Sequence, residues 1–167
     1  NVPFENVLTM EPVHAAWQYT PVTVCMVSSI STAGGRLRYV RPRMDTDPSD
    51  VSALESRANS HAEWVRDVAH YIQQAHKEGF GGMLALGTAF NDLAAIAELL
   101  RQLVDAPILE HKAGLPLATL RKRFLDLAEA GHRPILLAAG GAWTGFDLHS
   151  AQAPNACTDL VILNAPF

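Results

Sequence analysis

Short apolar runs alternate with longer amphipathic stretches through the last two thirds of the chain. Four of the apolar runs have the length of a strand, at residues 82–87, 107–110, 135–139 and 160–163. In the stretches between them, and before the first, apolar positions recur every three or four residues, which predicts helices with one inward face. Fully apolar strands alternating with such helices are typical of a mainly parallel sheet covered on both faces. The sequence therefore predicts a three-layer α/β domain with buried strands.

The helix ends carry local signals. Ser60 and Glu63 have the spacing of a capping box, which predicts a helix that begins at Ser60 and ends at Gly79. Thr88 directly follows an apolar run and is expected to cap the second helix. Pro116 is expected to open the third.

The first 59 residues form a different kind of segment. Residues 23–27 are apolar and β-branched, and residues 36–40 alternate basic with apolar side chains, so two strands are expected there. Residues 45–60 are rich in Asp, Ser, Asn and Pro and predict a loop or a short helix. We therefore expect a divergent N-terminal segment at 1–59 and the α/β domain at 60–167.

Composition narrows the class of protein. The chain of 167 residues is 49% hydrophobic and 18% charged, which excludes disorder as its main state. Its two cysteines provide no disulfide framework, and no long apolar run suggests a membrane span, so a cytoplasmic location is expected. The seven histidines lack metal-ligand spacing and are expected at the surface or at helix caps, and no metal site is expected.

Charge is distributed unevenly. The net charge of -4 does not by itself indicate a nucleic-acid partner. Arginines nevertheless cluster at positions 36–43, and a second basic cluster spans residues 121–123. Either cluster would suit phosphates or a plain solvated surface.

Two loops follow predicted strands and therefore belong at the carboxyl end of the sheet, where such folds bind ligands. In residues 140–147 the glycines allow a close backbone approach to an anion. Phe146 and Asp147 replace the Lys and Ser/Thr of a phosphate-binding P-loop, so that motif is excluded. Trp143 is either a stacking surface or a plug on the core. Thr88, in the other loop, suits either a phosphate contact or an N-cap.

Four segments together resemble one family in order and spacing. They are residues 83–90, 120–124, 135–147 and 160–167, and they are similar to the second motor domain of DinG/XPD-type superfamily 2 DNA helicases. The family pattern Leu-Leu-Ala-Thr-Gly-x-Phe-Trp-Glu-Gly-Val-Asp, followed by a strand ending in Leu-Pro-Phe, is matched at these positions: Leu136, Leu137, Ala138, Gly140, Trp143, Gly145, Asp147, Pro166 and Phe167. Ala142 and Thr144 depart from it, since the family has Phe and Glu there.

The resemblance implies a RecA-like domain at 60–167, cut before motif VI, within an ATP-dependent 5′-to-3′ DNA helicase. This chain would form one wall of the ATP cleft and part of the single-stranded DNA track, and would be inactive alone. ATP and Mg²⁺ would be bound mainly by the first motor domain of the same protein. The implied residues are catalytic Asp147 and Gly145, cleft-lining Gly140, Gly141 and Thr144, and DNA-binding Thr88, Trp143 and Arg121.

Several readings stay open on the sequence alone. The implied partners are single-stranded DNA and the first motor domain, and a CRISPR-associated DinG branch would add a CRISPR ribonucleoprotein. A free-standing enzyme that binds a nucleotide or a sugar phosphate through residues 140–147 is one alternative. A non-catalytic protein- or nucleic-acid-binding α/β module is another.

Overall fold

The computed structural model describes residues 51–163, and residues 1–50 and 164–167 lie outside that range. The strands expected at 23–27 and 36–40, the arginine cluster at 36–43 and the motif residues Pro166 and Phe167 therefore fall outside the described residues.

The centre of the described chain is a four-stranded sheet in which every pair of neighbours is parallel. Its strands are β1 (Gly82–Leu86), β2 (Ile108–Glu110), β3 (Ile135–Ala138) and β4 (Cys157–Ile162), in the spatial order β2-β3-β1-β4. β1 is central, with Leu84 paired to Leu136 of β3 and to Leu160 of β4. All four predicted strands are thus confirmed.

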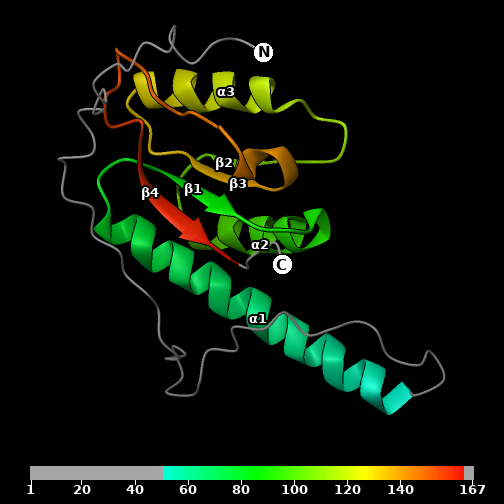
Figure 1. Cartoon of the computed structure of the whole chain (residues 1–167). Coiled ribbons are helices and arrows are strands. Elements are labelled where there is room, and N and C mark those ends of the chain that lie inside the picture. Colours follow the sequence, from blue (N-terminus) through cyan, green and yellow to red (C-terminus); the bar gives the residue numbers. More distant parts are fainter. Residues whose placement is uncertain (1–50, 164–167) are drawn as a thin grey trace, which may run out of the picture.

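Helices cover both faces of this sheet (Figure 1). α1 (Val51–Glu78) and α2 (Phe90–Leu103) pack on one face, where their buried side chains meet Met83 and Ile135. α3 (Leu117–Glu129) packs on the other, where Phe124 lies against alternate strand residues such as Leu136. The fold is therefore the predicted three-layer α/β arrangement, consistent with a RecA-like domain.

α1 corrects the expected helix start at Ser60. The helix begins at Val51 and runs without a break to Glu78, so Ser60 lies in its interior. Residues 53–58 include Ala, Leu, Glu and Arg, all good helix formers. A serine inside a helix costs only about 0.5 kcal/mol relative to alanine, so Ser60 does not end the helix. The first turns of α1 project past the end of the sheet (Figure 1).

The helices α2 and α3 were each expected to start at a particular residue. α2 has Ala89 as its N-cap, with no side-chain cap bond, so the prediction that Thr88 caps this helix is wrong by one residue. Asp92 in the first turn supplies the negative charge that the helix N-terminus favours. Pro116 is the N-cap of α3, which confirms that helix start.

β4 is less buried than a fully apolar run predicts. Leu160 and Ile162 are 59% and 58% exposed, and both occupy the face of the sheet on which α3 packs. β4 is the edge strand, and among residues 51–163 no element covers that face beyond β1. Val161, on the opposite face, packs against the core beneath α1 and α2.

Candidate ligand site at the carboxyl end of the sheet

The candidate site lies where the chain leaves two neighbouring strands in opposite directions. After β1 it passes to α2 on one face, and after β3 it passes to η3 (Gly140–Trp143) and on to β4 across the other. Leu148 and Ala156 of that second connection pack into the same core cluster as α3. Adjacent strands whose connections diverge in this way form a topological switch point, where open α/β sheets bind ligands.

The glycine turn after β3 presents backbone to solvent. Gly140 and Gly145 have φ of 60° and 67°, a left-handed conformation that favours glycine. A Cβ placed on either residue would meet no heavy atom within 4 Å, so the space beside both is open. Gly141 is also exposed. The predicted turn is therefore present, with room for a ligand against its main chain.

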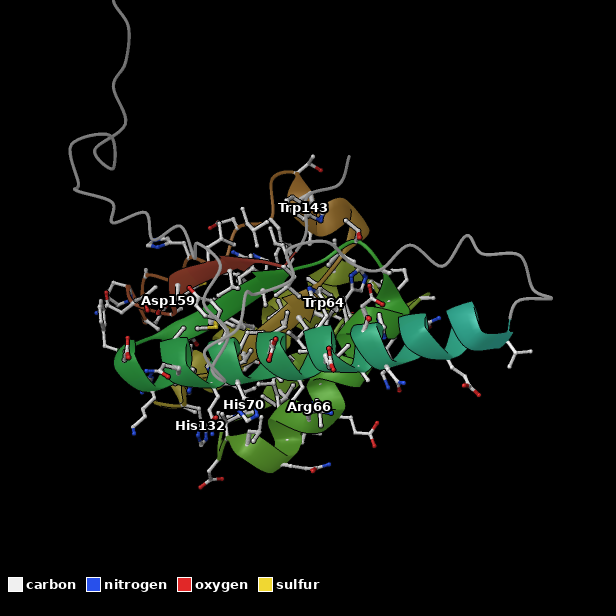
Figure 2. The ribbon with its side chains drawn as sticks, turned by 90° about the horizontal axis from the view of Figure 1, so that it is seen from below. Trp64, Arg66, His70, His132, Trp143 and Asp159 are labelled. Carbon is white, nitrogen blue, oxygen red and sulfur yellow. The ribbon has the colours of Figure 1, made fainter. Side chains whose placement is uncertain are left out.

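Trp143 joins the glycine turn to the loop after β1. Its indole Nε1 donates a hydrogen bond of 2.9 Å to the carbonyl oxygen of Gly87, and its half-buried ring packs against the core cluster on the α3 face. Figure 2 shows Trp143 on the short turn, well separated from Trp64, which packs in the core beneath α1. Of the two interpretations, a stacking surface or a plug on the core, the structure favours the plug. The indole bond also links the loops that leave β1 and β3.

Thr88 lies at the same end of the sheet as the glycine turn. Its neighbour Gly87 donates its amide to the carbonyl oxygen of Ala138, at 2.9 Å, and accepts the Trp143 indole bond. Thr88 itself is exposed. Thr144 is exposed too, and its hydroxyl donates to the Gly141 carbonyl oxygen at 3.4 Å. The structure thus brings the predicted threonines and glycines to one end of the sheet.

Arg121 and Asp147, 26 positions apart in sequence, are also brought together. Arg121 Nε donates to the Asp147 carbonyl oxygen at 2.7 Å, and its Nη2 lies 3.6 Å from the Asp147 carboxylate. Nη2 also reaches the His149 carbonyl oxygen at 3.4 Å. The two side chains are 42% and 68% exposed, so the ion pair itself adds little stability. Arg121 holds this loop rather than standing apart for a phosphate.

Two histidines that were expected at the surface belong to this end of the molecule. His111, directly after β2, is 8% exposed and lies 3.1 Å from the Ala139 carbonyl oxygen. His61 of α1 lies 3.0 Å from the buried carboxylate of Asp92 at the start of α2. The surface expectation is wrong for His111, although its position after a predicted strand was a usable signal.

The remaining ionisable chemistry is limited. Burial raises the pKa of the Cys157 thiol to about 11, which keeps it protonated at neutral pH. Within residues 51–163, no three His, Cys, Asp or Glu side chains gather closely enough to hold a metal ion. No helix in the described range is both long and apolar enough to cross a membrane.

No family model matches the chain, and a search of curated proteins finds no match to it.

Proposed function

We propose that this chain is part of the second motor domain of an ATP-dependent DNA helicase of the DinG/XPD type. The observation that carries the proposal is the convergence of the glycine turn, Thr88, Trp143 and the Arg121–Asp147 pair at one end of a parallel sheet. These residues come from the segments that resemble the family, and they occupy the edge where such sheets bind ligands.

In this proposal the glycine turn faces the nucleotide. Gly140 and Gly141 offer exposed main chain, with open space beside Gly140, which suits the close approach of a phosphate. Thr144 would line the same wall. As the family resemblance implies, ATP and Mg²⁺ would be held mainly by the first motor domain of the same protein. Bound Mg²⁺ would neutralise charge that develops on the phosphates during transfer.

Asp147 is proposed to couple nucleotide state to DNA grip. Its backbone and carboxylate are held by Arg121, and its Oδ1 accepts the His149 amide at 2.9 Å, so Asp147 links the loop to α3. A change at Gly145 or Gly140 would reach Asp147 through a short run of chain. Thr88, on the adjoining loop, would contact the phosphate of single-stranded DNA, and Trp143 would hold that loop in place through its bond to Gly87.

The direct test is Asp147→Ala in the complete motor protein. We expect unwinding to be lost while ATP binding by the first motor domain remains. Asp126→Ala is the matched control, because Asp126 is also exposed and pairs with a basic residue of α3, Lys122, at 2.7 Å. Wild-type unwinding by the Asp147 variant would contradict the assignment.

DNA binding is tested on the chain itself. A labelled oligothymidylate of about 20 nucleotides should bind with an affinity that falls steeply with salt. Arg121→Ala should weaken binding because it releases the Asp147 loop, whereas Arg101→Ala, an exposed arginine of α2 paired with Glu110, should not. A complex that forms only with protein, and that survives high salt, would favour the binding-module alternative instead.

A further inference from the structure

His111 occupies a position between three chain segments at the carboxyl end of the sheet. Its backbone amide donates to the Leu137 carbonyl oxygen at 2.9 Å and so continues the β2–β3 ladder by one residue. Its imidazole then continues the same ladder as a side chain, because Nδ1 lies 3.1 Å from the Ala139 carbonyl oxygen and 3.4 Å from the Ala139 amide. Either neutral tautomer therefore has a partner on Ala139.

Ala139 is the residue from which the glycine turn departs. It is the N-cap of η3, and its carbonyl oxygen also accepts the Ala142 amide at 3.4 Å. The backbone direction at Ala139 sets where Gly140 and Gly141 face. A buried imidazole held against both polar atoms of Ala139 fixes that direction.

The same ring contacts the loop after β1. The Phe90 ring meets His111 edge to face, with centroids 5.0 Å apart and planes at 88°. Phe90 is the first residue of α2, two positions after Thr88. The indole bond from Trp143 to Gly87 is a second link between the glycine turn and the loop after β1. His111 thus touches both loops that leave the switch point.

We propose that His111 is a positioning residue that couples the glycine turn to the Thr88 loop. A ligand that moves the turn displaces Ala139, and the imidazole transmits that displacement to Phe90 and the start of α2. The proposal rests on the proposed function only in taking these loops as the ligand-facing surface. It explains why a polar ring is buried at the end of β2, where an apolar residue would leave Ala139 without this bond.

The first test compares His111→Leu with His111→Asn in the full chain by NMR. Asn carries a polar atom at the position of Nδ1 and should keep the bond to Ala139, whereas Leu cannot. We expect His111→Leu to shift the Trp143 indole resonance and the amides of residues 87–90 and 140–145, and His111→Asn to restore them. His132→Leu, at an exposed histidine, is the control. Unchanged loop resonances in a folded His111→Leu protein would overturn the proposal.

Phe90→Leu provides a variant that does not endanger the fold, because Phe90 is 38% exposed. It removes only the ring contact, and we expect it to shift the amides of Ala139 and Gly140 on the neighbouring loop. Absence of those shifts would overturn the coupling even if His111→Leu failed to fold.

Binding separates this proposal from the proposed function. The dissociation constant for the oligothymidylate should rise about fivefold in His111→Leu and stay within about twofold in His111→Asn. Equal weakening by both variants would contradict positioning through Ala139. If the wild-type chain does not bind the oligothymidylate, the proposed function fails, while the loop resonances still decide the role of His111.

Discussion

At the scale of single residues, close packing and open space distinguish glycines that look alike in the sequence. Gly82 opens β1 under the ring of Phe124, and a Cβ there would lie 2.7 Å from Phe124 Cζ and would also collide with the Ala156 carbonyl oxygen. Gly141 lies in the exposed turn, where a Cβ would meet only the flexible end of Leu117, at 3.3 Å. The first glycine is required by packing, and the second is available for a ligand.

This contrast predicts opposite outcomes for two matched substitutions. Gly82→Ala should lower the free energy of unfolding by about 1–3 kcal/mol, since the backbone carbonyl cannot move aside cheaply. Gly141→Ala should change it by about 0.5 kcal/mol or less and instead weaken ligand binding. Chemical denaturation of both variants measures the difference. Equal stability of the two would contradict the packing described around Gly82.

The Cys157 thiol predicts a specific pH dependence. Its pKa in the folded protein is raised from 9.0 to about 11, so the unfolded state loses this proton first as the pH rises. The contribution to stability is therefore intact below pH 9 and declines between about pH 9 and pH 11. In a Cys25→Ala background, the thiol should also react with a thiol reagent at pH 8 about a hundredfold more slowly than an ordinary cysteine.

Cys157→Ala is the control for this prediction, because it should lack the decline in stability over that pH range. A reaction rate at pH 8 equal to that of a free cysteine would contradict the burial of the thiol.

At the scale of elements, β1 and β3 could be predicted from sequence because burial on both faces leaves a continuous apolar run, and β4 carries such a run although one of its faces is exposed. The helix starts were harder, since a capping box at Ser60 competes with strong helix formers on its N-terminal side. The position of His111 after a predicted strand was a signal, but its contact with Ala139 and the Arg121–Asp147 contact were not predictable from local sequence. Each depends on which loops the strand order β2-β3-β1-β4 brings together, which local pattern does not encode.

Ala62→Pro tests whether α1 is continuous through Ser60. In a helix that began at Ser60, this exposed position would fall in the first turn, where proline is tolerated. In the observed helix it is interior, so we expect a loss of about 3 kcal/mol in the free energy of unfolding. Ala62→Gly should cost only about 1 kcal/mol. Similar small losses of unfolding free energy for both variants would indicate instead that the helix begins at the capping box at Ser60.

At the scale of the whole molecule, the layers and the strand order place both divergent loops at one end of the sheet. Among residues 51–163, the titratable and aromatic groups proposed to act on ligand lie there, while the core clusters beneath α1 and α2 and beneath α3 hold the scaffold. The edge strand β4 exposes Leu160 and Ile162 on the face of the sheet on which α3 packs, and Ile162 pairs with Leu86 at the same end of the sheet. The central claim is that the carboxyl end of the sheet is the ligand-binding surface.

The most direct measurement of that claim is an NMR titration of the labelled chain with the oligothymidylate of about 20 nucleotides. We expect shifts confined to residues 87–90 and 140–147, to the Trp143 indole and to the Arg121 side chain. Shifts centred on β4 or on the outer face of α1, with the glycine turn unchanged, would contradict that claim.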